Sequence, residues 1–161
     1  PLQMVRAYCA LANGGYLLKL RMIDRLENPD TGHVMKIPVK PGFKIYKNPE
    51  THQKIVSMMK LVTQEGDTAT KAALEGYSVA GKTGTSQKVI AGQYSHSKFF
   101  ASFVGFVPAD NPAFVLFVTV DEPQGAQYGG TISAPAFKQI SERTLRYLDI
   151  KPETLSTVVS N

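Results

Sequence analysis

Two long apolar segments, residues 98–107 and 113–120, constrain the fold of this chain more than any other feature of its sequence. Both are rich in phenylalanine and valine, which favour β-strands. The segment between them begins and ends with proline and predicts a hairpin turn. Residues 113–120 are apolar on both faces, which is typical of a central strand that is covered on both sides. The sequence therefore predicts an antiparallel sheet with packing layers on its two faces.

Three helices and a third strand are expected around this strand pair. Residues 2–13 have apolar side chains at spacings of three and four and stop at two glycines, a helix terminator. A second helix starts near Pro49, where proline suits a first turn, and ends at Gly66. Residues 76–86 predict the third strand, and the last helix is expected to begin near residues 133–135.

The predicted order is helix, helix, three antiparallel strands, helix, which is an α+β arrangement. Residues 28–48 contain several prolines and glycines and predict a loop. The polar tail from Lys151 predicts a frayed end. These helices do not supply enough cover for a strand that is apolar on both faces, so we expect something else to pack against it.

Composition excludes several classes of protein. The chain is 43% hydrophobic and 19% charged, which supports one ordinary core and argues against wholesale disorder. Its net charge is +5, but the basic residues are scattered, so we expect no nucleic-acid partner. A basic surface suits an anionic membrane or cell-wall polymer equally well.

No apolar run is long enough to span a membrane. The histidines lack metal-ligand spacing, so no metal or cofactor is expected.

The tetrapeptide Lys82–Thr85 brings a cation and two hydroxyls onto the predicted third strand. Alternation places Thr83 and Thr85 on one face and the lysine on the other, although a twist at Gly84 would let the lysine head group reach the rim of a cleft. Because Gly84 has no side chain, a ligand backbone can lie against the strand there. These groups suit a ligand that binds as an added strand and carries a carboxylate.

A phosphate-binding loop is the competing interpretation of the same segment. Residues from Gly76 to Thr83 satisfy its pattern, and the apolar strand that ends at Asp121 resembles one that holds magnesium. Such a loop follows a buried strand and opens a helix, whereas the residues before Gly76 are not strand-like and residues 84–86 form helices poorly. Nucleotide binding stays open as an alternative, as does a noncatalytic ligand-binding module.

The pattern Ser-x-x-Lys occurs at residues 57–60 and 95–98. A serine nucleophile needs a lysine base within hydrogen-bond distance, usually at the start of a helix in a cleft. Ser57 falls in the middle of a predicted helix, and Ser95 falls in a predicted polar loop. We therefore expect neither serine to be a nucleophile.

From Pro1 to about Leu148 the chain resembles the C-terminal half of the transpeptidase domain of class B penicillin-binding proteins, most closely the septal, cell-division type. The lysine tetrapeptide is one of three short motifs that build the active site of these serine enzymes. Several segments in one order carry the resemblance. They are residues 1–4, 12–15, 80–85, 103–109, 121–123, 128–131 and 134–137.

The resemblance implies a five-stranded antiparallel sheet between helical layers, of which this chain supplies the last three strands. Residues 1–150 would be the C-terminal part of the domain, and residues 151–161 a flexible tail. The implied activity is cross-linking of peptidoglycan stem peptides during septal cell-wall synthesis, through an acyl-enzyme that β-lactams also form. The implied location is the periplasmic face of the cytoplasmic membrane, with an anchor outside this sequence and other division proteins as further partners.

The resemblance also assigns roles to individual residues. Lys82 would assist the proton network and anchor the anion, and the Thr85 backbone N–H would be one oxyanion-hole donor, so these two are the catalytic candidates. Tyr94 and Tyr128 would form aromatic walls around the ligand. The expected substrate-binding set is Thr83, Gly84, Thr85, Tyr94 and Tyr128.

The nucleophile is expected to lie outside this chain. In the family, Ser-x-x-Lys and Ser-x-Asn lie well upstream of the lysine motif, and this sequence has no equivalent upstream segment. We expect an N-terminal complement of the same domain to supply both motifs. Alone, the chain is expected to be inactive.

Overall fold

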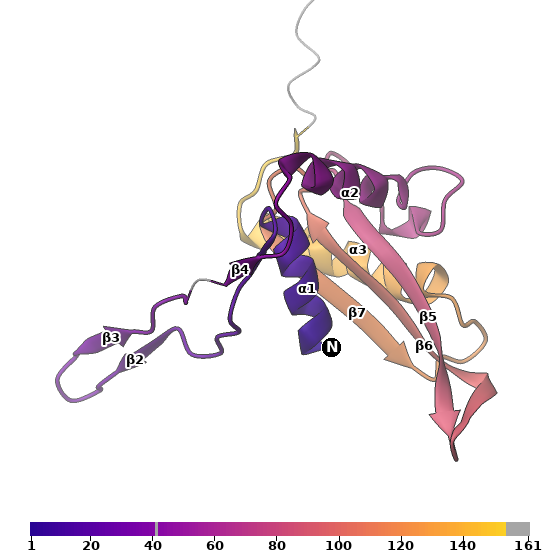
Figure 1. Cartoon of the computed structure of the whole chain (residues 1–161), viewed down its shortest axis with the longest axis horizontal. Helices are drawn as coiled ribbons and strands as arrows, with labels where there is room; N and C mark the ends of the chain where they lie inside the picture. Colours follow the sequence, from indigo (N-terminus) through magenta and orange to yellow (C-terminus); the bar gives the residue numbers. More distant parts are fainter. Residues whose placement is uncertain (41, 154–161) are drawn as a thin grey trace, which may run out of the picture.

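The computed structural model describes residues 1–40 and 42–153 and contains a three-stranded antiparallel sheet with helices on both faces (Figure 1). The strands, in their order across the sheet, are β5 (Ala80–Ile90), β6 (Gln93–Val107) and β7 (Phe114–Asp121). The helices are α1 (Leu2–Ala12), α2 (Pro49–Leu61) and α3 (Gly129–Tyr147). The predicted α+β class is confirmed. Residues 154–161 of the predicted tail lie outside the described residues.

Helix α3 and one face of β6 form the larger hydrophobic core. Phe103 and Val107 of β6 are fully buried there, together with Phe137 and Leu145 of α3. The rings of Phe103 and Phe137 meet edge to face with centroids 4.7 Å apart, a favourable geometry for aromatic rings. The core therefore joins the middle of the sheet directly to α3.

The opposite face of the sheet is covered by α1 and α2. Phe106, which alternates with Phe103 and Val107 along β6, is buried against Val56 of α2 and Tyr8 of α1. Helix α2 begins as the sequence predicts, because the Asn48 side chain accepts a hydrogen bond from the Glu50 N–H at 2.9 Å and Pro49 follows this cap.

Strand β7 does not have the central position that its apolar pattern predicts. It pairs only with β6 in the described part of the chain and forms one edge of the sheet, with β6 in the centre. The prediction of cover on both sides is correct, since α1 packs on one face of β7 and α3 on the other, and residues 114–118 are all half-buried. An apolar pattern reports burial of the two faces, which is independent of whether both edges are paired.

Two small antiparallel pairs lie between α1 and α2, and one strand of each pair falls within residues 28–48, the predicted loop. Strands β2 (Arg25–Glu27) and β3 (Val34–Lys36) form a hairpin that reaches away from the sheet, and β1 (Tyr16–Leu17) pairs with β4 (Phe43–Lys44) at its base (Figure 1). These strands are too short for alternation to reveal them. The 3₁₀ helix η1 (Thr70–Ala72) was missed for the same reason.

Other boundaries also differ from the predictions. Strand β5 covers residues 80–90 instead of 76–86, and α2 ends at Leu61, before the predicted end at Gly66. Helix α3 begins at Gly129, a full turn before the predicted start, and β6 begins at Gln93, so Ser95 lies in a strand and not in a loop. The differences in α3 and β6 come from residues with weak intrinsic preference, glycine in the helix and a polar run in the strand, where tertiary packing decides the conformation. No helix in residues 1–40 and 42–153 combines the length and apolar character needed to cross a bilayer.

We expect Phe137→Ala to lower the free energy of unfolding by about 3–5 kcal/mol, because it removes a fully buried ring and leaves a cavity beside Phe103. Phe43→Ala is the matched control. Its ring is 65% exposed, and its loss should cost less than about 1 kcal/mol. The measurement is urea unfolding followed by circular dichroism. Equal losses in the two variants would contradict this assignment of the core.

Candidate functional site

The tetrapeptide Lys82–Thr85 lies in the first half of β5, at the opposite edge of the sheet from β7. Its residues pair with β6 from Val104 to Ala101, and the other side of β5 has no strand partner among the described residues. An unpaired strand edge exposes backbone N–H and C=O groups that can accept an extended peptide. The predicted strand position of the motif is therefore correct, and its edge is open to a ligand.

Thr83 and Thr85 face the first turn of α3. The Thr85 hydroxyl accepts a hydrogen bond from the Gly129 N–H at 3.3 Å. Both threonines line a small cleft of about 280 Å³, which is completed by Tyr128, the glycine pair at the helix start, Thr68 and Thr131. The N-terminus of a helix carries a partial positive charge and favours anions. The cleft thus combines hydroxyls with a helix end, which suits a carboxylate.

This cleft exists because the first turn of α3 contains no side chain where it meets the strands. A Cβ atom on Gly129 would overlap the Ser102 carbonyl oxygen, and one on Gly130 would overlap the Thr68 carbonyl oxygen. Only glycine allows the backbones to approach so closely. Glycine has a low helix propensity, but here the glycine pair is what allows α3 to start beside the threonines.

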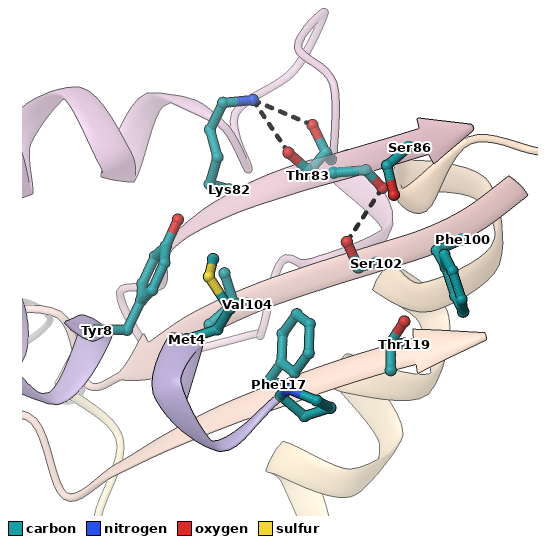
Figure 2. A pocket seen from close by; sticks show the side chains of 12 residues that line it. Met4, Tyr8, Lys82, Thr83, Ser86, Phe100, Ser102, Val104, Phe117 and Thr119 are labelled. Carbon is teal, nitrogen blue, oxygen red and sulfur yellow. Dashed lines mark hydrogen bonds between the residues drawn. The ribbon is translucent and has the colours of Figure 1, made fainter. Parts of the chain in front are cut away.

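Lys82 starts on the opposite face of β5, but its head group reaches back over the strand edge (Figure 2). The Lys82 Nζ donates to the Thr83 carbonyl oxygen at 3.2 Å and to the Thr83 Oγ1 at 3.3 Å. The ammonium group therefore lies on the threonine side of the strand. The sequence analysis had the lysine head group reach the rim of the cleft in this way. One cation and one hydroxyl lie together at the open edge.

Gly84 lies against the side chain of a neighbour within the sheet. A Cβ atom there would lie 2.5 Å from the Ser102 Oγ, and this hydroxyl donates to the Gly84 carbonyl oxygen at 3.2 Å (Figure 2). Close packing of Ser102 against Gly84 is thus a structural reason for glycine at this position. The sequence analysis did not identify this reason. Contact between Gly84 and a ligand backbone stays a prediction.

A second, larger cavity of about 390 Å³ lies on the Lys82 face of the sheet, between the strands and the start of α1 (Figure 2). Its walls are mainly apolar and include Met4 and Tyr8 of α1, Phe100 of β6 and Phe117 of β7. Partial burial raises the pKa of the Tyr8 phenol. Sequence reasoning did not find this cavity. The helical spacing of Met4 and Tyr8 was the available signal, because residues four apart lie on one helix face.

The two predicted aromatic walls occupy different places. Tyr128 lines the cleft with Thr85 and is 62% exposed. Tyr94 pairs with Val89 near the tip of the β5–β6 hairpin, is 69% exposed, and lines neither this cleft nor the larger cavity beside α1. The structure therefore brings Tyr128 to the lysine motif and leaves Tyr94 apart from it.

The structure contradicts the nucleotide-binding alternative. Lys82 and Thr83 lie inside a long β-strand, whereas the lysine of a phosphate loop stands at the start of a helix. Asp121, the proposed magnesium ligand, is hydrogen-bonded to Lys88 at 2.8 Å. In the described ranges 1–40 and 42–153, no group of three or more histidine, cysteine or acidic residues is arranged to hold a metal ion.

Neither Ser-x-x-Lys pattern has the geometry of a nucleophile and its base. Ser57 is exposed on α2, and Lys60 donates to both carboxylate oxygens of Asp110. The Ser95 hydroxyl accepts a hydrogen bond from the Lys98 N–H at 3.1 Å, while the Lys98 ammonium lies 3.1 Å from a Glu122 oxygen. In both patterns the lysine is paired with an acid instead of the serine hydroxyl.

An ion-pair cluster that sequence reasoning missed joins residues of the three strands with Glu122, which directly follows β7. Hydrogen bonds from Lys88 and Lys98 lower the pKa of the Glu122 carboxyl, and hydrogen bonds to Asp121 and Glu122 raise the pKa of Lys88. Glu122 therefore stays ionised in the folded protein at pH values below its ordinary pKa. Its contribution to stability is complete above the ordinary pKa and is lost as the pH falls through the lowered folded-state value. The shifts of Lys88 and Glu122 both favour the charged forms.

Comparison with known proteins shows which family the chain resembles in sequence. The sequence matches the family described as penicillin binding protein transpeptidase domain over residues 1–142. The probable peptidoglycan D,D-transpeptidase PenA of Neisseria gonorrhoeae is 38% identical over 152 residues, which are 94% of this chain and 24% of that protein. Stage V sporulation protein D of Bacillus subtilis is 39% identical over 153 residues, with the same coverage of 94% and 24%.

A solved structure extends the likeness to three dimensions. Penicillin binding protein 3 of Mycobacterium tuberculosis, complexed with ampicillin, matches with a TM-score of 0.84 and 28% identity, over 97% of this chain and 36% of that one. The chain spans about a quarter of the length of the curated relatives that it matches.

We expect Gly129→Ala to lower the free energy of unfolding by about 1–3 kcal/mol, because the added methyl group overlaps the Ser102 carbonyl oxygen and must push α3 away from β5. The control is Gly92→Ala, whose added methyl meets nothing within 4 Å and whose positive φ of 81° should cost only about 1 kcal/mol. Urea unfolding measures both. A Gly129→Ala variant as stable as the parent would mean that the helix start does not need this close approach.

Proposed function

This chain belongs to the penicillin binding protein transpeptidase domain family, and on that basis we propose that it forms one wall of the active site of a serine D,D-transpeptidase. The enzyme cross-links peptidoglycan stem peptides and is acylated by β-lactams. One observation carries the proposal: the Lys82 ammonium group and the Thr83 hydroxyl lie together at the unpaired edge of β5, beside the N-terminus of α3.

The edge geometry suits the terminal carboxylate of a stem peptide. A peptide that lies along β5 as an added strand makes backbone hydrogen bonds with it, and the strand edge sets its direction. The Lys82 ammonium group and the Thr83 and Thr85 hydroxyls then hold the carboxylate, and the end of α3 adds favourable electrostatics. Ampicillin, which is named with the Mycobacterium tuberculosis structure, carries a carboxylate too and would use the same groups.

The chemical step divides between this chain and the rest of the enzyme. A serine hydroxyl outside this chain attacks the carbonyl of the penultimate residue, its proton passes through the lysine network to the leaving amine, and the terminal residue departs. An amine of a second stem peptide then attacks the acyl-enzyme and releases the serine. The Thr85 backbone N–H donates to the oxygen that becomes negatively charged in each step.

The nucleophile belongs to an N-terminal complement of the same domain, which carries Ser-x-x-Lys and Ser-x-Asn. Residues 1–150 form the C-terminal part of that domain. The geometry of Ser57 and Ser95 supports this division, because the lysine of each pattern is paired with an acid. The enzyme acts in septal synthesis during cell division, at the periplasmic face of the cytoplasmic membrane.

We expect Lys82→Ala to slow acylation of the assembled domain, this chain with its complement, by at least about tenfold. Charge-assisted contacts to a carboxylate are worth about 1.5–3 kcal/mol, and about 1.4 kcal/mol in the barrier is a factor of ten. The measurement is the second-order rate of acylation by a fluorescent penicillin, with circular dichroism as the folding check. Lys54→Ala, which removes an exposed lysine of α2, is the matched control.

Two further results would contradict the assignment. If folded Lys82→Ala is acylated as fast as the parent, the lysine motif is not part of the active site. If Ser57→Ala or Ser95→Ala abolishes labelling while the fold is preserved, the nucleophile lies in this chain and the division proposed above is wrong.

We expect Thr85→Val to slow acylation less than Thr85→Pro does. Valine removes the hydroxyl but keeps the backbone N–H, whereas proline removes the N–H that would stabilise the oxyanion. Loss of one oxyanion donor costs about 100-fold or more in rate. Because proline also disturbs a strand, its effect is interpreted only if the circular dichroism spectrum of the variant matches that of the parent. Equal rates for the two variants would remove Thr85 from the oxyanion hole.

A further inference from the structure

The pairing of β5 with β6 is interrupted beyond the lysine motif. Gln87 pairs with Phe99 but Val89 pairs with Tyr94, so β6 carries extra residues between the two pairs. Within this bulge the Ser95 hydroxyl accepts hydrogen bonds from the N–H groups of Ser97 and Lys98, at 3.3 Å and 3.1 Å. Bulges bend a strand pair and re-aim the segment that follows. The bulge therefore sets the direction of the hairpin tip.

Four charged side chains, from the three strands and from Glu122 directly after β7, meet at this bulge. Lys88 donates to Asp121 Oδ1 at 2.8 Å and to Glu122 Oε1 at 2.7 Å. Lys98, on the other side of the bulge, lies 3.1 Å from the second oxygen of Glu122. The Lys88 ammonium also lies 5.0 Å from the centre of the Phe100 ring. We name Lys88, Lys98, Asp121 and Glu122 the charge clamp.

Glu122 is the central member of the charge clamp, and its backbone is strained. Its φ is 49°, in the left-handed region that a residue with a side chain rarely adopts. Its N–H donates to the Phe99 carbonyl oxygen at 2.9 Å, and its two carboxylate oxygens are held by the two lysines. Because Glu122 follows β7 directly, this conformation fixes the direction in which the chain leaves the sheet toward α3.

The segment that leaves Glu122 leads to the candidate cleft. Pro123 and residues 125–128 form one side of a cavity of about 380 Å³, and Ser97 and Phe99 of β6 form the other. Tyr128 lines both this cavity and the cleft that contains Thr85. The charge clamp thus lies at the base of the segment that carries the tyrosine wall of the cleft.

We propose that the charge clamp positions the 123–128 segment against β6, and that it thereby holds Tyr128 where a bound ligand meets it. Its members are positioning residues, since they act through Tyr128 and contact no reacting atom. The proposal rests on the proposed transpeptidase function for its kinetic consequence, but the structural consequence is independent of it. Without the clamp, ligand binding weakens while the chemistry at the lysine motif continues.

A surface ion-pair network with no effect beyond stability is the alternative that the experiment must separate. Exposed pairs usually add little to stability. The clamp differs in two respects: the Lys88 side chain is only 21% exposed, and the network fixes a strained residue next to a cavity. A structural role alone would lower the thermal stability and leave the ligand dependence of acylation unchanged.

The test uses Glu122→Gln in the assembled domain, with acylation followed as a function of fluorescent penicillin concentration. We expect the half-saturating concentration to rise about threefold, a change of the size that exposed charge pairs produce. The limiting acylation rate should change less than about twofold, because no group at the lysine motif is altered. Lys88→Arg, which keeps the charge, should retain most of the parent affinity, whereas Lys88→Met should resemble Glu122→Gln.

Glu142→Gln is the control, because it removes one acid from a more exposed ion pair with Lys138 on α3, at 4.0 Å, which adjoins neither the bulge nor the 123–128 segment. It should leave both kinetic quantities unchanged. Hydrogen–deuterium exchange supplies a readout that does not depend on activity. Glu122→Gln should raise exchange in residues 94–98 and 123–128 and leave that of the α3 core unchanged.

Each outcome decides a different question. If the parent is acylated but Glu122→Gln alters neither half-saturation nor exchange, the charge clamp does not position the segment and the proposal is overturned. A variant that only unfolds at a lower temperature overturns it too. If the parent is not acylated at all, the proposed function fails, and exchange alone then decides whether the clamp holds the segment.

Discussion

The close approach of the first turn of α3 to the backbone of β5 and β6 is the constraint on which the candidate site depends. Gly129 and Gly130 lie where any side chain would overlap a carbonyl oxygen of Ser102 or Thr68. This approach brings the Gly129 N–H to the Thr85 hydroxyl and places a helix N-terminus beside the motif. Behind it, Phe137 locks α3 to the centre of the sheet through Phe103. A displaced helix would lose the cleft and the core contact together.

The same arrangement explains why the open edge of β5 is suited to binding. Three separate elements converge there: the Lys82 ammonium group from β5, the helix end from α3, and Tyr128 from the segment between β7 and α3. Hydrogen bonds hold Lys82 and the helix end in place, and the proposed role of the charge clamp is to do the same for Tyr128, so a ligand would need little reorganisation of the site. Preorganised polar groups of this kind are what binding and catalysis require.

Several features were predictable because they are encoded locally. The strand pair at residues 98–107 and 113–120 follows from its apolar run and its proline-bounded turn, and α2 begins where Pro49 indicates. The resemblance to penicillin-binding transpeptidases, based on several short segments in order, is confirmed by the family match. The edge position of β7, the early start of α3 and the strand location of Ser95 were not predicted, because each is decided by partners distant in the chain.

The sequence by itself determined the residue types: a lysine and two threonines on one strand, a glycine pair before an amphipathic helix, and a core rich in phenylalanine. Only the tertiary structure decided which of them meet. In the folded chain the Lys82 head group contacts Thr83 across the strand edge. Tyr128 lines the cleft, whereas Tyr94 lies at the hairpin tip. Two lysines form ion pairs with Asp121 and Glu122. The physical reason is that strand pairing and helix docking join residues far apart in the chain, and periodicity describes only neighbours.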